Sequence, residues 1–307
     1  MIKMFDIRDC FFDEVLTLAM ADKQIVIVTN DMDVFSLRLF KERFPERFIN
    51  VGVAEQNMVN VAAGLASCGK KVVIYGITPF LIYRCFEQIK FNICSMNLPV
   101  VFAGIGTGLA FSYDGPTHHA THDIGVLNTL PEMSIFNPGD AYTAKLTAQL
   151  AIKSTSPTFV RIDKGMYPLL NDKKIIINDG YSILKELKDI NLIATGSMTR
   201  RALEISEILR SKNINIGVVD IFKLKTLPVS LYENVISKSK KIITLEEHES
   251  EIGLGAIIEK LCTQYKVPIY KFGTIDKQIF DYGDRDWLLK KMNLDVEFLS
   301  TKIQSIS

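Results

Sequence analysis

The sequence predicts an α/β fold made of two domains, and two patterns carry this prediction. Short apolar runs alternate with longer stretches whose apolar residues recur at helical spacing, which is typical of parallel sheets covered by helices on both faces. The alternation stops in a passage rich in Lys, Asn and Asp and then begins again. A chain of 307 residues, 48% of them hydrophobic, is long enough to bury two cores.

The first domain is predicted over residues 1–165. Apolar runs that indicate strands span residues 24–29, 48–51, 71–75, 100–103, 133–136 and 158–162. Helical periodicity is found over residues 5–19 and 80–96, in the segment that begins near Glu55, and after Asp140. We therefore expect one parallel sheet with polar residues gathered at the carboxyl ends of its strands.

A second, smaller α/β domain is predicted over residues 188–307, after a linker over residues 166–187. Strands are expected there at residues 191–195, 214–219 and 241–245, and an amphipathic helix at residues 199–212. The sequence contains no internal repeat and no low-complexity segment.

Composition and charge exclude several classes of protein. The formal net charge is +1, with acids and bases interspersed, so nothing indicates a nucleic-acid or membrane-surface partner. No apolar run is long enough to span a membrane, and the N-terminus lacks the apolar core of a secretory signal. The five cysteines are odd in number and never spaced Cys-x-x-Cys, which favours a cytoplasmic location.

A single carboxylate lies in the stretch of residues 50–64. The apolar residues around it recur at helical spacing: Ala54, Met58, Val61, Ala62 and Leu65. Glu55 therefore falls in the first turn of a predicted helix. One interpretation is that Glu55 only complements the helix dipole, as most first-turn acids do. The other is that Glu55 is the central carboxylate of a buried site.

The glycine-rich run of residues 104–108 follows a predicted strand but does not fit a nucleotide site. A dinucleotide fingerprint requires Gly-x-Gly-x-x-Gly, and Leu109 or Phe111 occupies the third glycine position here. No Walker lysine follows either. We expect these glycines to let the backbone bend close to a ligand or a neighbouring segment.

The densest polar cluster spans residues 114–123 and holds three of the chain's four histidines. His118 and His122 have the spacing of two metal ligands on a helix, although neither thiolates nor a His-Glu-x-x-His arrangement accompany them. Three interpretations stay open: a metal site, solvated loop histidines, and histidines that bind a polyhydroxylated substrate and move protons.

Four motifs, in this order and at this spacing, resemble the thiamine-diphosphate enzymes of the transketolase family. They are Gly52-Val-Ala-Glu55-Gln-Asn-Met58, Phe80 with Arg84-Cys-Phe-Glu-Gln88, Asp114-Gly-Pro-Thr-His118, and Phe159-Val-Arg161. The similarity covers nearly the whole chain. It implies a pyrimidine-binding domain of the thiamine-diphosphate fold and a transketolase C-terminal domain, as in the C-terminal subunit of split transketolases and the later part of deoxyxylulose-phosphate synthase.

On the cofactor side, the resemblance gives Glu55 a catalytic role, in which it hydrogen-bonds the ring nitrogen of the cofactor's aminopyrimidine. A carboxyl in an apolar, water-poor pocket is expected to have a raised pKa and to hold that proton. Phe80 matches the aromatic residue that stacks on the pyrimidine, a role that Tyr83 can share; the alternative for Phe80 is ordinary core packing. A looser likeness places Asp31 near the cofactor.

On the substrate side, Asp114 and His118 match the family's pair that binds hydroxyls of the sugar donor, and His118 also assists proton transfer. Arg161 matches the arginine that grips the sugar phosphate, a task that suits its fork geometry; the alternative is a surface ion pair. His119 and His122 differ from the commoner residues at their positions, so the resemblance assigns them no role.

The family binds Mg²⁺ through a Gly-Asp-Gly motif followed later by Asn, and this motif is absent from the sequence. Gly139-Asp140 and Gly283-Asp284 are not followed by Gly. The resemblance therefore implies that this chain supplies no metal ligand and that an N-terminal partner subunit holds the diphosphate and Mg²⁺ of thiamine diphosphate. The expected assembly is an α2β2 heterotetramer.

The resemblance implies a transferase, active only with its partner, that moves a two-carbon ketol unit from a ketose phosphate to an aldose acceptor. Within the enzymes, the alternatives are a deoxyxylulose-phosphate-synthase-like subunit and a 2-oxoacid dehydrogenase β-type subunit. From another class, the alternative is a non-catalytic partner subunit that retains the fold. The sequence assigns neither the two sugars nor the pathway.

Overall fold

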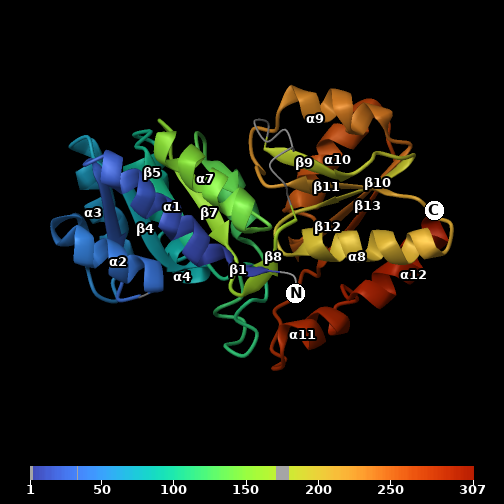
Figure 1. Ribbon diagram of the computed structural model, residues 1–307, viewed down its shortest axis with the longest axis horizontal. Helices are drawn as coiled ribbons and strands as arrows, with labels where there is room; N and C mark the ends of the chain where they lie inside the picture. Colours follow the sequence, from blue (N-terminus) through green and yellow to red (C-terminus); the bar gives the residue numbers. More distant parts are fainter. Residues whose placement is uncertain (1–2, 33, 171–179) are drawn as a thin grey trace. The chain divides into compact units, whose positions relative to one another are not determined.

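The computed structural model describes residues 3–32, 34–170 and 180–307, and the chain divides into two compact units (Figure 1). Unit 1 comprises Met1–Thr107 and Gly125–Leu169, and unit 2 comprises Gly108–Ile124 and Leu170–Ser307. Each unit contains its own large β-sheet. The prediction of a two-domain α/β fold is confirmed.

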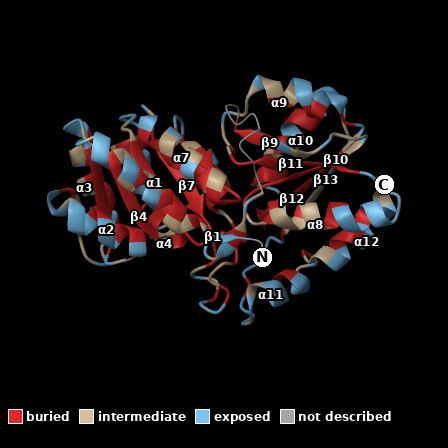
Figure 2. Ribbon diagram, viewed as in Figure 1, coloured by how far each residue is buried: buried red, intermediate tan, exposed pale blue. Residues whose placement is uncertain are grey.

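Unit 1 is built around a parallel sheet of six strands in the order β3-β2-β4-β5-β7-β6. The strands are β2 (Ile25–Thr29), β3 (Phe48–Asn50), β4 (Lys71–Ile77), β5 (Val100–Ile105), β6 (Ser134–Phe136) and β7 (Thr158–Ile162). β2, β5 and β7 are buried along their whole length (Figure 2), as expected for apolar runs with helices on both faces. Because the strands are parallel, their carboxyl ends lie along one edge of the sheet.

The helices of unit 1 begin where the sequence supplies caps. The Asp6 side chain accepts hydrogen bonds at the start of α1 (Ile7–Ala21), and Asp140 forms a capping box with Thr143 at the start of α7 (Ala141–Lys153). Figure 1 shows α1 and α7 side by side. Unit 1 also contains α2 (Phe35–Arg43), the 3-10 turn η1 (Pro45–Arg47), α3 (Glu55–Ser67) and most of α6 (Asp123–Asn128), whose first two residues belong to unit 2.

The helical stretch predicted over residues 80–96 is not one continuous helix. The chain forms three short pieces: α4 (Thr78–Ile82), α5 (Phe86–Gln88) and the π-helical turn η2 (Ile89–Cys94). The interruption between α4 and α5 contains Arg84, whose side chain donates to Glu55. Apolar periodicity does not reveal this break, because residues on both sides of it remain buried.

Unit 2 contains a five-stranded mixed sheet in the order β13-β12-β10-β11-β9, in which only β9 runs antiparallel to its neighbour. The strands are β9 (Tyr181–Lys185), β10 (Ile190–Ala194), β11 (Gly217–Ile221), β12 (Lys241–Glu249) and β13 (Ile269–Thr274). The helices are α8 (Met198–Ser211), α9 (Val229–Asn234), the 3-10 turn η3 (Ile236–Lys238), α10 (Leu254–Tyr265), α11 (Arg285–Lys291) and α12 (Val296–Ile306). In Figure 1, α8 and α12 lie on one side of this sheet, and α9 and α10 lie on the other.

Both ends of the predicted linker, residues 166–187, contain strands. β8 (Met166–Pro168) pairs with β1 (Met4–Asp6) in a two-stranded antiparallel sheet, and β9 is an edge strand of the unit 2 sheet. Residues 171–179 of the predicted linker lie outside the described residues. The sequence did not predict strands in this linker, because strands as short as β1 and β8 leave little periodic signal.

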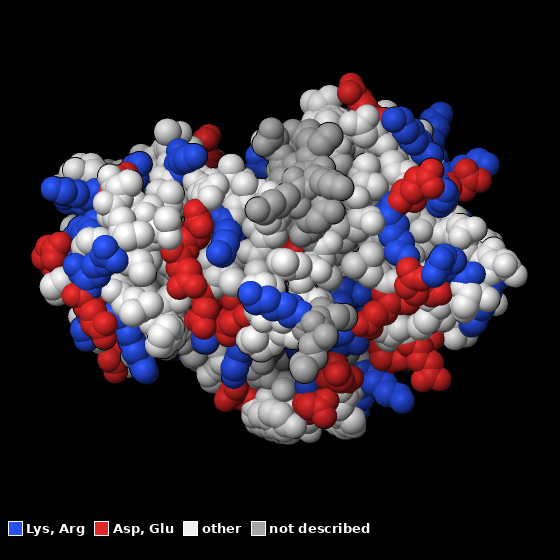
Figure 3. Space-filling model, viewed as in Figure 1, with Lys and Arg blue, Asp and Glu red and all other residues white. Residues whose placement is uncertain are grey.

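Charges of both signs are interspersed over the surface that faces the viewer in Figure 3. This distribution agrees with the near-neutral formal charge of the sequence. In the part of the chain that the structure describes, no helix is long and apolar enough to cross a membrane.

Candidate active site

Glu55 is the first residue of α3 and follows β3, so it lies at the carboxyl edge of the parallel sheet. Its side chain is 4% exposed. Oε1 accepts a hydrogen bond from Asn30 Nδ2 at 2.9 Å, and Oε2 accepts one from Arg84 Nη1 at 2.7 Å. Two side-chain donors therefore hold this buried carboxylate, which also lies in the first turn of α3, where a negative charge complements the helix dipole.

The expectation that Glu55 has a raised pKa is wrong for this chain. Burial acts to raise the pKa, but hydrogen bonds from its own backbone N–H, from Arg84 and from Asn30 together hold the pKa of Glu55 below its ordinary value. The reason is that an ionised carboxylate gains more from these donors than it loses through desolvation. The sequence motif contains Glu55 but does not reveal the donors that face it.

Phe80 lies in α4 and contacts the same arginine. The guanidinium carbon of Arg84 is 4.7 Å from the centroid of the Phe80 ring, a cation–π distance. The structure therefore connects Glu55, Arg84 and Phe80 within unit 1. Tyr83 is the C-cap residue that directly follows α4. Stacking of a pyrimidine on Phe80 or Tyr83 stays a prediction.

Asp31 follows β2 with a φ of 67°, a backbone region that Asp tolerates better than most residues. Its backbone N–H donates to Asn50 Oδ1 at 3.0 Å, and Asn50 Nδ2 donates to Asp31 Oδ1 at 3.1 Å. Both residues line a cavity of about 570 Å³ at the ends of β2 and β3. Contact between Asp31 and a cofactor stays a prediction.

The loop of residues 108–124 is attached to β12 in unit 2 through three successive strand residues. Glu247 Oε1 accepts from Leu109 N at 2.6 Å, the Glu249 N–H donates to the carbonyl of Thr121 at 3.0 Å, and His248 Nε2 accepts from the N–H of Ile124 at 3.1 Å. Both ends of the loop are thereby fixed on the same strand.

Gly108 shows why the first of these attachments needs a glycine. Its φ is +52°, and a Cβ there would lie 2.5 Å from the side chain and 2.6 Å from the carbonyl oxygen of Glu247. The run of residues 104–108 thus bends the backbone against a neighbouring segment, which was one of the two expected uses of these glycines.

Asp114 and His118 lie in a turn of this loop, where the His118 N–H donates to the carbonyl of Gly115 at 3.0 Å. Asp114 is exposed and His118 is half-buried. His118 Nδ1 lies 3.0 Å from Thr117 Oγ1, and the imidazole lies 5.9 Å from the ring of Phe111 between centroids. The turn keeps both predicted substrate residues on one short segment, and their roles stay a prediction.

His119 and His122 have different surroundings. His119 is buried, and this burial lowers the pKa of its imidazole; the nearby His118 lowers that pKa further. His122 Nε2 lies 3.2 Å from Glu249 Oε2, and its Nδ1 lies 3.0 Å from Thr121 Oγ1. His122 therefore helps to join the loop to β12. Among the described residues, no group of three His, Cys, Asp or Glu side chains could hold a metal ion.

Arg161 lies in β7, opposite Gly104 of β5, and its side chain is 2% exposed. The alternative of a surface ion pair is thus wrong for this chain, because the side chain is not at the surface. Phosphate binding by Arg161 stays a prediction.

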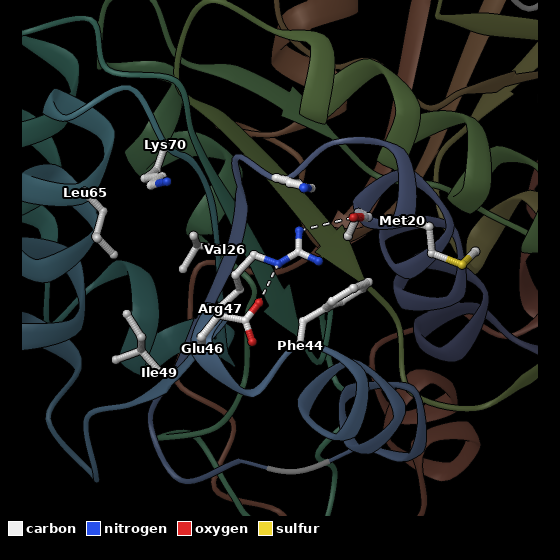
Figure 4. Close-up of a pocket in the computed structure, with 10 residues that line it drawn as sticks. Met20, Val26, Phe44, Glu46, Arg47, Ile49, Leu65 and Lys70 are labelled. Atoms are coloured by element: carbon white, nitrogen blue, oxygen red, sulfur yellow. Dashed lines mark hydrogen bonds and ion pairs between the residues drawn. The ribbon is translucent and has the colours of Figure 1, made fainter.

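A second cavity, of about 510 Å³, opens beside Arg47 (Figure 4). Arg47 Nη1 donates to the carbonyls of Ala19 and Asp22, and its guanidinium stacks on Phe44 at 3.6 Å. These contacts fix the end of α1 to η1, so we assign Arg47 a structural role. None of the predicted site residues lines this cavity.

Sequence reasoning placed Asn30 at the end of a strand but assigned no role to Asn30 or to Arg84. The signal for Asn30 was available, because a polar residue directly after a buried strand lies at the ligand edge of a parallel sheet. Arg84 belongs to a quoted motif, but no rule of spacing shows that its side chain reaches back to Glu55.

Models of two protein domains match this chain. The transketolase pyrimidine-binding domain matches residues 3–169, and the transketolase C-terminal domain matches residues 180–297. The chain belongs to the transketolase family. Enzymes of the transketolase family generally use thiamine diphosphate and a divalent metal. The resemblance noted in the sequence is confirmed.

Individual members of the transketolase family match over different shares of their length. One subunit of the apulose-4-phosphate transketolase of Phocaeicola vulgatus is 33% identical, over 96% of this chain and 95% of that protein. The 1-deoxy-D-xylulose-5-phosphate synthase of Clostridium tetani is 30% identical, over 96% of this chain but 48% of that enzyme. A solved split gene transketolase, described as an inactive beta4 tetramer, has 30% identity and a TM-score of 0.88, with 97% of both chains covered.

Proposed function

We propose that this chain is the C-terminal subunit of a two-chain, thiamine-diphosphate-dependent transketolase, which transfers a two-carbon ketol unit from a ketose phosphate to an aldose acceptor. The observation that carries the proposal is Glu55, a buried carboxylate at the carboxyl edge of a parallel sheet. The chain that holds it is similar, over 96% of its length, to a protein named as one transketolase subunit. The two sugars remain unassigned.

The residues of unit 1 fit the pyrimidine half of the cofactor. When bound, thiamine diphosphate supplies the electron sink that carries the two-carbon unit. Glu55 would hydrogen-bond a ring nitrogen, and its lowered pKa suits a carboxylate that receives this bond in its ionised form. The ring of Phe80, already in contact with the planar guanidinium of Arg84, offers a surface for stacking.

The substrate contacts would come from two segments. Asp114 and His118 would bind the hydroxyls of the sugar donor, and His118 would move a proton near the reacting carbonyl. Arg161 would bind the sugar phosphate through its guanidinium fork. For Arg161, this assignment requires that its buried side chain becomes accessible in the assembled enzyme.

A partner subunit completes the proposal. The sequence lacks the Gly-Asp-Gly motif, and the similar protein of Phocaeicola vulgatus is itself named as one subunit of a transketolase. We infer that the N-terminal subunit holds the diphosphate and Mg²⁺ and that the assembly is a cytoplasmic α2β2 heterotetramer.

A second candidate function is the deoxyxylulose-phosphate-synthase-type reaction. It is favoured by the 30% identity to the enzyme of Clostridium tetani, which extends over 96% of this chain. The chain spans about half of that enzyme's length, so this reaction too would need a partner. Assays of the mixed subunits with a ketose phosphate and with a 2-oxoacid donor separate the two functions.

The test of the main proposal is a Glu55→Gln variant assayed with the N-terminal subunit. We expect turnover to fall at least about a hundredfold, because the charge that supports the ring-nitrogen proton is lost. The circular dichroism spectrum should be unchanged, since glutamine has nearly the same shape. Full activity in this variant would disprove the proposed role of Glu55.

A further inference from the structure

Asn30 lies directly after β2, and its side chain is nearly as buried as Glu55, at 5% exposed. Its Nδ2 donates to Glu55 Oε1 at 2.9 Å in a fully buried hydrogen bond. This bond connects the end of one strand with the start of the helix that follows the next strand. Its loss would leave one oxygen of a buried carboxylate without its side-chain donor, which is costly for a buried charge.

The second polar atom of Asn30, Oδ1, is buried and has no hydrogen-bond partner among the described residues. Gly76 in β4 gives this atom its space, since a Cβ at residue 76 would lie 3.3 Å from Oδ1. Glycine weakens a strand interior, and it is often found where another group approaches closely. An ionised carboxylate only accepts hydrogen bonds, so the amide must direct its NH₂ group toward Glu55.

Arg84, the second donor to Glu55, has a different environment. Its side chain is 47% exposed, and its Nη1 reaches Glu55 Oε2 at 2.7 Å. Solvent screens such an ion pair, and an exposed arginine can change its rotamer at little cost. The Asn30 amide is buried, so solvent has little access to replace Glu55 as its acceptor. The two oxygens of Glu55 therefore differ: Oε1 is held from the buried side, and Oε2 is held from the exposed side.

We propose that Asn30 is a positioning residue that fixes Glu55 through Oε1, so that Oε2 is the oxygen presented to the ring nitrogen of the aminopyrimidine. This inference rests on the proposed role of Glu55 and adds to it the residue that orients the carboxylate. On this proposal, the residue at position 76 is glycine because a side chain there would crowd the Asn30 amide.

The proposal predicts how the proton affinity of Glu55 responds to Asn30. Removal of the amide donor in Asn30→Ala should raise the pKa of Glu55 by about one pH unit, the effect of one hydrogen bond to a charged group. Asn30→Asp keeps the shape but places a second carboxyl beside the first. Two carboxyls at this distance share a proton, so this variant should raise the pKa of the pair further.

The test is an NMR titration of the side-chain carboxyl carbons in the full chain, with Glu55→Gln to assign the Glu55 signal. Calorimetry of thiamine diphosphate and Mg²⁺ binding to the two-subunit mixture is the second readout. We expect both Asn30 variants to raise the pKa and to weaken cofactor binding about tenfold, equivalent to one such hydrogen bond. As a matched control, Asn92→Ala deletes a single exposed bond to Asn60 and should leave the Glu55 titration unchanged.

If Asn30→Ala fails to fold, the near-isosteric Asn30→Asp variant tests whether Asn30 positions Glu55. An unchanged Glu55 titration and unchanged cofactor affinity in a folded Asn30→Asp chain would overturn the assignment. If that result is found while Glu55→Gln is inactive, only the role of Asn30 fails. If Glu55→Gln keeps full activity, the proposed function itself fails.

Discussion

Glu55 shows how hydrogen bonding can outweigh burial at a single residue. Desolvation alone favours the neutral acid, yet the backbone N–H at the start of α3 and the donors Arg84 and Asn30 favour the carboxylate. The result is a buried group that is ionised before any ligand arrives. A ligand that offers a protonated ring nitrogen then meets a charge that is already in place.

This lowered pKa predicts a specific pH dependence of stability. Because the folded pKa lies below the unfolded value of about 4.3, Glu55 stabilises the fold above that pH and loses this effect as pH falls through the folded pKa. Urea unfolding between pH 6 and pH 3 should show a steeper loss of stability for the wild type than for Glu55→Gln. Parallel curves would show that the folded pKa of Glu55 is not lowered.

The position of Glu55 was predictable from sequence, whereas its partners were not. Apolar spacing places it in the first turn of a helix, and α3 indeed begins at Glu55. Its pKa depends on Asn30 and Arg84, which lie 25 and 29 residues away along the chain. Local patterns do not encode which distant side chains meet, so the direction of the pKa shift was predicted wrongly.

At the scale of elements, β12 organises much of unit 2. Glu246 Oε2 and Oε1 accept from the N–H groups of Leu254 and Gly255, both at 2.6 Å, and so bind the start of α10. The next residue, Glu247, accepts from Leu109 N and from Arg285, the first residue of α11. One strand thus fixes two helices and the loop that carries Asp114 and His118.

Removal of the Glu247 carboxylate should release that loop. Glu247→Ala leaves Arg285, 18% exposed, without its carboxylate and should cost about 3 kcal/mol of unfolding free energy, as for other broken buried pairs. Hydrogen exchange should accelerate at the amides of residues 109–124. Glu186→Ala, which removes an exposed carboxylate paired with Lys188, is the matched control and should change neither quantity. Equal exchange in both variants would contradict an anchoring role for Glu247.

The element pattern itself was largely predictable where segments are long and periodic. The strand over residues 158–162 and the helix near residues 199–212 are found within one residue of their predicted ends. The sequence did not predict the shortest elements or the break at Arg84, because two or three residues are too few to show a periodic pattern. The attachment of residues 108–124 to β12 was also unpredictable, since contacts separated by more than a hundred residues leave no local signal.

At the scale of the whole molecule, we propose that this chain supplies one half of a cofactor site. Its family match, its buried Glu55 and the missing Gly-Asp-Gly motif all support a subunit that needs a partner. Association with the N-terminal subunit would then bring the diphosphate site to the pyrimidine site.

The most direct measurement is calorimetric titration of thiamine diphosphate with Mg²⁺ into this chain alone, into the N-terminal subunit alone, and into their mixture. We expect tight binding only in the mixture, and weaker binding when Glu55→Gln replaces the wild-type chain. Absence of binding in the mixture, or binding of equal strength to the N-terminal subunit alone, would contradict a site shared between the two chains.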